Sequence, residues 1–203
     1  MAQQEYSNNV FINCPFDDHY NVIFRAIVFA VFDCGFIPRC AMEYDDGGQV
    51  RIEKIYRLIS ECKYGIHDIS RTELDNGLPR FNMPLELGIF MGAKRFGNDQ
   101  DGNKLCMIID REKYRYQEFI SDISGQDVKS HDNDFKKAID KVSDWLRTAS
   151  RRKTIPGGAA IARRYEIFND LLPELCAEAR ITHAELTFND YCQFVVEWLK
   201  TIP

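Results

Sequence analysis

Two carboxylates, Glu86 and Asp68, have the sequence surroundings that best suit chemistry. Glu86 follows Asn82 and Pro84, which are typical of a helix N-cap and first turn, so we expect Glu86 in that first turn. Asp68 and Ser70 stand near the end of an apolar run that predicts a buried strand. Carboxylates at such positions stabilise positive charge, as in the oxocarbenium-like state of glycosidic bond cleavage. The structural alternatives are that Glu86 complements the helix dipole and Asp68 caps a loop.

Other kinds of catalytic centre have little support in the sequence. No GxGxxG or Walker phosphate loop occurs, and the histidines and cysteines lack metal-ligand spacing. A serine or cysteine nucleophile would need a histidine base that we cannot assign, since His67 falls inside a strand and reads as a core residue. We therefore expect no metal and no resident cofactor.

Apolar runs that predict strands alternate with segments that predict helices. The strands are expected at residues 10–14, 36–41, 64–70 and 104–110, with a short fifth near 126–128, and the helices at 16–35, 52–59, 82–95 and 135–146. This alternation predicts an α/β, doubly wound (flavodoxin-like), mainly parallel sheet in the order 2-1-3-4-5. Gly88 and Gly92 in the third helix predict a face pressed against a strand or a ligand.

In such a sheet the ligand site lies beyond the carboxyl ends of the strands, where several acids are expected to gather. They are Asp17, Glu43, Asp45, Asp46, Asp68 and Glu86. Crowding by like charges would push their pKa values apart, so that Asp68 could serve as an acid while the helix N-terminus keeps Glu86 ionised. Our candidate substrate-binding residues are Asp17, Tyr20, Arg39, Asp45, Ser70, Arg80 and Asn82.

A basic segment with a Pro-Gly-Gly turn, within residues 147–158, indicates a domain boundary. We expect an α/β domain at residues 1–150 and a helical C-terminal extension at 151–203. The apolar stripes of the extension predict docking on the sheet domain or on a second copy of the chain, and we also expect a homo-oligomer. A DNA-reading helix-turn-helix is the alternative.

The composition limits the classes of binding partner and the cellular compartment that we expect. The chain has 203 residues, of which 45% are hydrophobic, and a formal net charge of −5. The acidic balance argues against nucleic acid or an anionic membrane as the main partner. Without a signal-like N-terminus or an apolar run of about 18 residues, we expect a cytoplasmic protein.

Two short motifs resemble known families. Asp68, a loop and then Pro84–Ala93 resemble the nucleoside 2-deoxyribosyltransferase and nucleotide N-hydrolase family. The opening Val10–Asp17 is similar to the first strand and loop of Toll/interleukin-1 receptor (TIR) domains, which share this fold and in bacteria often cleave NAD. The resemblance covers about residues 8–146. It implies Glu86 as the catalytic glutamate and Asp68 as the acid that holds the base.

One departure from the family pattern favours a phosphorylated substrate. Six residues before the glutamate, deoxyribosyltransferases usually have Asp and N-hydrolases Ser, whereas this chain has Arg80. A cation there suits a phosphate or pyrophosphate. The resemblance thus implies an N-glycosidase acting on a nucleotide or NAD, in a context such as bacterial antiviral defence. The alternative is a non-catalytic TIR-like module that senses a nucleotide or associates with itself.

Overall fold

One five-stranded, all-parallel sheet forms the centre of the molecule. The computed structural model describes residues 2–44, 46–72, 74–75 and 78–202. The strands run in the order β2-β1-β3-β6-β7. They are β1 (Asn9–Asn13), β2 (Ile37–Arg39), β3 (Tyr64–Asp68), β6 (Leu105–Asp110) and β7 (Val128–Ser130). The doubly wound α/β fold and the strand order predicted from the sequence are confirmed.

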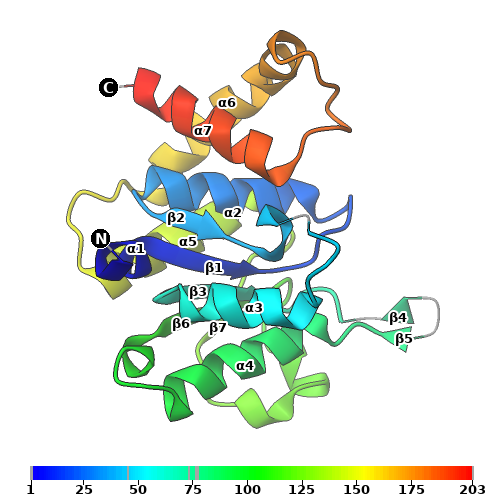
Figure 1. Ribbon diagram of the computed structural model, residues 1–203, viewed down its shortest axis with the longest axis vertical. Coiled ribbons are helices and arrows are strands. Elements are labelled where there is room, and N and C mark those ends of the chain that lie inside the picture. The colour runs from blue at the N-terminus through cyan, green and yellow to red at the C-terminus, as the bar shows by residue number, and fades with distance from the viewer. Residues whose placement is uncertain (1, 45, 73, 76–77, 203) are drawn as a thin grey trace.

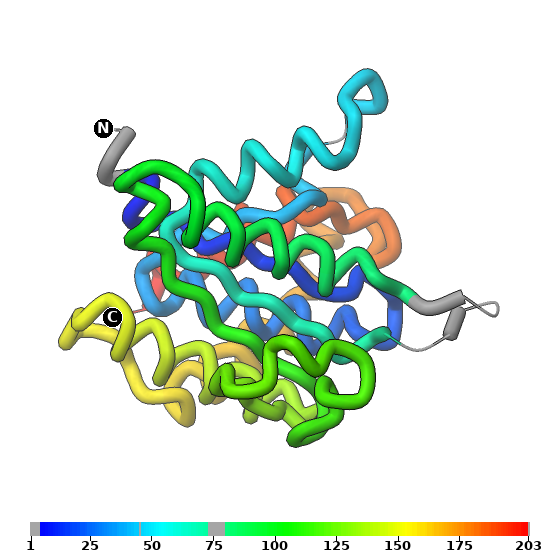
Figure 2. The backbone as a smooth tube through the Cα atoms, turned by 90° about the horizontal axis from the view of Figure 1, so that it is seen from below, coloured from blue at the N-terminus to red at the C-terminus, as the bar shows by residue number. Residues whose placement is uncertain are grey.

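Helices cover both faces of the sheet (Figures 1 and 2). These helices are α2 (Asn21–Asp33), α3 (Arg51–Ser60), α4 (Asn82–Phe96) and α5 (Phe135–Ser150). β1 shows the two-sided packing, because side chains alternate along a strand. Val10 and Ile12 belong to the core cluster beneath α2 and α5, whereas Phe11 packs with residues of α3 and α4.

The last two helices, α6 (Gly158–Glu178) and α7 (Phe188–Thr201), lie outside α2 as a further layer (Figure 1). The ring of Phe29 in α2 has its centroid 5.4 Å from those of Tyr165 and Phe168 and 5.8 Å from that of Trp198. α2 is therefore covered by the sheet on one side and by α6 and α7 on the other. This double cover explains why its sequence is apolar nearly all round.

Several short elements were not predicted. α1 (Ala2–Asn8) precedes the first strand, and a two-stranded hairpin of β4 (Leu74–Asp75) and β5 (Leu78–Pro79) lies between β3 and α4. Four 3-10 turns follow β2, α4 and β6: Ala41–Glu43, Asp101–Asn103, Arg115–Glu118 and Ser121–Ile123. None of the helices among the described residues is long and apolar enough to cross a membrane.

The third predicted helix differs from expectation at its start and along one face. Asn82 is the first residue of α4 and not its cap; Phe81 holds the N-cap position, without a side-chain cap bond. Gly88 and Gly92 do not mark a close approach, because a Cβ added at either would meet nothing within 4 Å. Lys94 and Arg95 do occupy the last turn, where they complement the helix dipole.

Candidate functional site

Glu86 lies in a cleft at the carboxyl end of β1. It is only 8% exposed and stands one residue beyond the first turn of α4, later than the sequence suggested. The cleft has a volume of about 330 Å³. It is lined by Asn13, Cys14, Pro15, Phe16, Arg51, Arg80, Phe81, Asn82, Met83 and Glu86. The helix start and the strand end thus meet at the edge of the sheet where ligands bind in this fold.

Burial dominates the electrostatics of Glu86. It raises the pKa of Glu86 to about 7, and the nearby charge of Arg51 opposes this rise. The expectation that the helix N-terminus keeps this carboxylate ionised was therefore wrong. The dipole effect falls off within the first turn, and Glu86 lies beyond it. At neutral pH the side chain is divided between its acid and its carboxylate forms.

The walls of the cleft combine cations with aromatic rings. Arg51 and Arg80 line it together with Phe16 and Phe81, two residues that are 40% and 58% exposed. Arg80 Nη1 lies 3.3 Å from Oδ2 of Asp17. Asp17 belongs to an adjoining pocket that shares Phe16 with the cleft, so it anchors Arg80 at the rim. Guanidinium groups bind phosphates, and exposed aromatic rings stack on bases.

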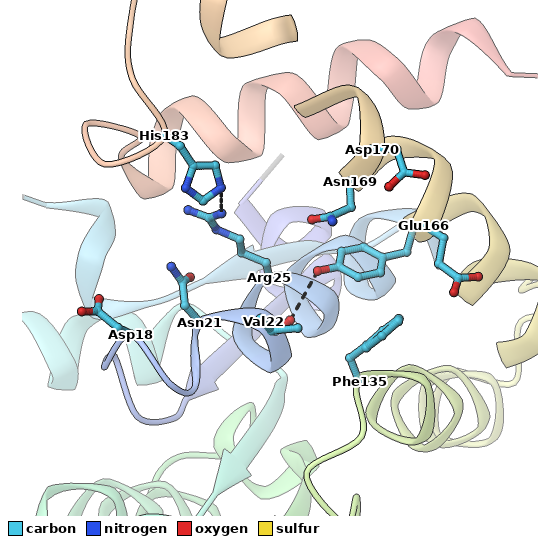
Figure 3. A pocket seen from close by; sticks show the side chains of 10 residues that line it. Asp18, Asn21, Val22, Arg25, Phe135, Glu166, Asn169, Asp170 and His183 are labelled. Carbon is cyan, nitrogen blue, oxygen red and sulfur yellow. Dashed lines mark hydrogen bonds between the residues drawn. The ribbon is translucent and has the colours of Figure 1, made fainter. Parts of the chain in front are cut away.

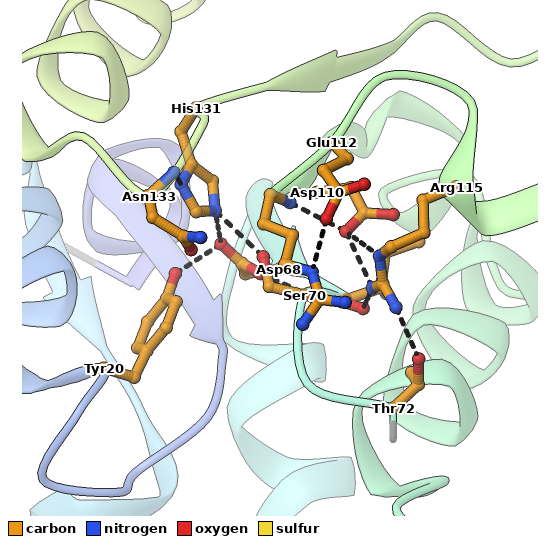
Figure 4. A network of polar contacts seen from close by, with 11 residues as sticks. Tyr20, Asp68, Ser70, Thr72, Asp110, Glu112, Arg115, His131 and Asn133 are labelled. Carbon is orange, nitrogen blue, oxygen red and sulfur yellow. Dashed lines mark hydrogen bonds and ion pairs between the residues drawn. The ribbon is translucent and has the colours of Figure 1, made fainter.

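Asp68 lies apart from this cleft, in a buried polar network (Figure 4). Its carboxylate accepts hydrogen bonds from the Tyr20 hydroxyl and from the Ser70 backbone N–H at 2.8 Å, and lies 3.0 Å from His131 Nε2. All four residues are at most 3% exposed. Burial and the neighbouring Asp68 charge raise the pKa of the Tyr20 hydroxyl far above its usual value. Tyr20, Asp68 and Ser70, all predicted site residues, thus meet in this network, and none of them lines the cleft.

The hydrogen bonds of this network fix the tautomer of His131. Its Nδ1 accepts from the Asn133 backbone N–H at 3.1 Å, so in the neutral ring the proton is on Nε2. That N–H faces both Asp68 and the Ser70 hydroxyl, the latter at 2.9 Å. A serine nucleophile needs an unprotonated histidine nitrogen as its base. This arrangement therefore joins the strand ends and does not activate Ser70.

Arg115 extends the polar contacts behind Asp68. It donates to Asp110 Oδ1 at 2.7 Å, to the Ile69 carbonyl at 2.6 Å and to the Thr72 hydroxyl at 3.1 Å (Figure 4). These bonds tie the start of the loop after β3 to the loop after β6. Sequence reasoning missed both Arg115 and His131. His131 directly follows β7, and this strand-end position was the available signal.

One further predicted residue, Arg39, is not in the cleft lining. Arg39, on the edge strand β2, donates from Nε to Glu43 at 2.7 Å and from Nη2 to Glu61 at 3.0 Å. This pairing holds it beside the start of the loop after β2. Asp45 lies outside the described residues. Arg51 and Asn13 do line the cleft, although sequence reasoning singled out neither; both stand at the end of an element that borders the site.

A larger cavity, of about 550 Å³, lies between α2, α5, α6 and the segment that leads to α7 (Figure 3). Arg25 Nη1 lies 2.6 Å from His183 Nε2, and the Tyr165 hydroxyl donates to the Val22 carbonyl at 3.3 Å. None of the residues predicted from the sequence lines this cavity. We therefore place the candidate site in the smaller cleft, where the predicted carboxylate lies.

Comparison with known proteins finds a similarity that covers only part of the chain. No protein-family model matches the chain. Part of the chain is similar to Protein tirC of Dictyostelium discoideum, with 30% identity over 91 residues. The match covers 39% of this chain and 44% of that protein, so the chain spans less than half the length of the relative it matches. The similarity supports a TIR-like character and offers nothing for the deoxyribosyltransferase resemblance.

Proposed function

We propose that this chain is a TIR-like N-glycosidase that cleaves the bond between base and ribose in a nucleotide such as NAD. The observation that carries the proposal is the composition of the cleft: Glu86 lines it together with two arginines and two exposed phenylalanines. Such a lining offers a phosphate site, a base-stacking site and one carboxylate for a sugar cation.

In the proposed reaction the C–N bond breaks, and its electron pair leaves with the base. The positive charge that develops at the anomeric carbon is stabilised by the Glu86 carboxylate. A water molecule then adds its oxygen to that carbon and releases a proton. Glu86 either stabilises the cation while water attacks or first forms a covalent ester that water hydrolyses. Both routes require Glu86 in its ionised form.

The electrostatics of the cleft support this role once a ligand is bound. In the empty cleft burial, opposed by Arg51, holds the pKa of Glu86 near 7, but a positively charged ligand group, such as an oxocarbenium-like sugar or a nicotinamide ring, favours the carboxylate. Arg51 and Arg80 supply positive charge for phosphates on the same surface. The proposed site thus separates the cationic and anionic parts of one substrate.

The experiment that tests the proposal is incubation with NAD, nucleoside monophosphates and deoxynucleosides, followed by chromatography of the free base. Glu86→Gln keeps the shape of the side chain and removes its charge, so it should lower kcat by orders of magnitude while binding survives. Glu53→Gln, an exposed change on α3, is the matched control and should leave the rate unaltered. Equal rates for Glu86→Gln and the wild type would refute the role of Glu86.

The second candidate is a non-catalytic TIR-like module that senses a nucleotide. It is favoured because Glu86 is the one carboxylate among the described residues that line the cleft, since Asp68 is enclosed in its own network. A sensor would bind nucleotides in calorimetry and release no base from any of them. Self-association on nucleotide addition, followed by light scattering, would then be its expected output.

A further inference from the structure

The side-chain amide of Asn13 has a fixed orientation on the cleft wall. Asn13 is the last residue of β1 and is 2% exposed. Its Nδ2 lies 2.8 Å from the Met83 carbonyl oxygen and 3.1 Å from His67 Nδ1. A carbonyl oxygen can only accept, so the NH₂ group and not Oδ1 must face Met83. The same NH₂ group then donates to His67, whose Nδ1 is the acceptor.

His67 is locked in the matching state. Because Nδ1 accepts, the ring proton is on Nε2, and burial lowers the pKa of His67 to about 3, so the ring is neutral. The ring centroids of Phe11 and Phe90 lie 5.9 and 4.9 Å from the centroid of the His67 ring, so the two rings pack against it. A Cβ at Gly65 would come within 2.7 Å of Nε2, so the glycine provides the space that the ring occupies. This packing makes the Asn13 amide a rigid group.

The orientation leaves Oδ1 of Asn13 as an acceptor at the cleft. Among the residues that the structure describes, Oδ1 has no hydrogen-bond partner, and Asn13 lines the same cleft as Glu86. Met83, to which Asn13 is bonded, and Glu86 are three residues apart in α4 and so lie on neighbouring turns of one helix face. Asn13 and the carboxylate proposed to act on the sugar therefore belong to the lining of one cleft.

We infer that Asn13 is a specificity-determining residue whose Oδ1 accepts a hydrogen bond from the 2′-hydroxyl of a ribonucleotide. The inference rests on the proposed function, which places the anomeric carbon at Glu86. The atoms next to that carbon are the ring oxygen, the base nitrogen and C2′, and the 2′-hydroxyl is the neighbouring group that can donate. A rigid acceptor rejects an analogue that lacks the donor, because the acceptor is then desolvated without a partner.

The test measures binding, which does not depend on catalysis. Calorimetry on the Glu86→Gln variant, which blocks turnover, compares ADP with 2′-deoxy-ADP, 2′-fluoro-2′-deoxy-ADP and 3′-deoxy-ADP. ADP should bind about tenfold more tightly than 2′-deoxy-ADP. The 2′-fluoro analogue cannot donate and should bind no better than the 2′-deoxy analogue. Removal of the 3′-hydroxyl is the matched ligand control and should have the smaller effect.

The protein variant is Asn13→Ala in the same background, which should abolish the difference between ADP and 2′-deoxy-ADP. Persistence of that difference would overturn the inference, as would equal binding of these two ligands to the parent or no binding of ADP. If Asn13→Ala does not fold, the 2′-fluoro analogue provides the test. If that analogue binds as tightly as ADP, the site needs no hydrogen-bond donor at C2′, and Oδ1 of Asn13 does not accept from the 2′-hydroxyl. If no base is released but the protein still discriminates at the 2′ position, the proposed enzymatic activity is refuted and the binding role of Asn13 is retained.

Discussion

Glu86→Gln should stabilise the protein at alkaline pH while it removes the proposed activity. The pKa of Glu86 rises from 4.5 to about 7 because the side chain is buried. Between these two values the folded protein keeps a proton that the unfolded chain releases, so the free energy of unfolding falls as pH rises. Each pKa unit corresponds to about 1.4 kcal/mol, so burial of the carboxylate costs about 3 kcal/mol above pH 7. Glutamine is neutral and avoids this cost.

The measurement is thermal unfolding of the wild type and the variant at pH 5 and pH 8. At pH 5 most of the penalty is absent, and the two proteins should differ by less than about 1 kcal/mol. At pH 8 the variant should be more stable by about 3 kcal/mol, which for a chain of this size is about 6–12 °C in Tm. Glu53→Gln, on the exposed side of α3, should change Tm equally at both pH values. A difference for Glu86→Gln that does not depend on pH would refute the reasoning.

The remaining predictions concern the pH profile, the phosphate site and the C-terminal layer. The kcat/KM of base release should increase as pH rises through about 7, because the ionised form of Glu86 in the free protein is required; a kcat/KM that stays flat from pH 5 to 8 would contradict this. Arg80→Ala should raise KM for phosphorylated substrates by a factor that corresponds to about 1.5–3 kcal/mol of lost binding free energy. An equal rise of KM for nucleosides would exclude a phosphate role. Phe168→Ala should cost about 3–5 kcal/mol in thermal unfolding, because Phe168 is fully buried, whereas Ile167→Ala, at an exposed position, should cost little.

The helix that carries Glu86 illustrates how much of the site sequence reasoning can reach. The Asn-x-Pro start and the basic last turn located α4 within a residue or two, because these are local preferences of helix ends. Its first residue and its missing side-chain cap were not predictable to that precision. The shift is small, but it moves Glu86 out of the first turn and away from the strongest part of the helix dipole.

The candidate site shows a different limit. Asp68, Tyr20 and Ser70 were each expected at the carboxyl edge of the sheet, and in the structure hydrogen bonds join them in one network. The same reasoning placed them with Glu86, whereas in the structure Asp68 is buried beside His131 and does not line the cleft. Arg39, likewise, is paired with Glu43 and Glu61 and does not line the cleft. Strand order determines which edge a residue reaches, but side-chain partners determine which pocket it lines.

By itself the sequence determined the fold, since alternating apolar runs and amphipathic segments are repeated local signals that a parallel sheet satisfies in few ways. It also determined that Glu86 lies in the N-terminal half of a helix near the ligand edge and that Arg80 precedes this helix. Only the tertiary structure decided the pKa of Glu86, the enclosure of Asp68 and the orientation of the Asn13 amide. These properties depend on burial and on partners far apart in the chain, such as His67 and Met83 for Asn13, and no local pattern encodes such contacts.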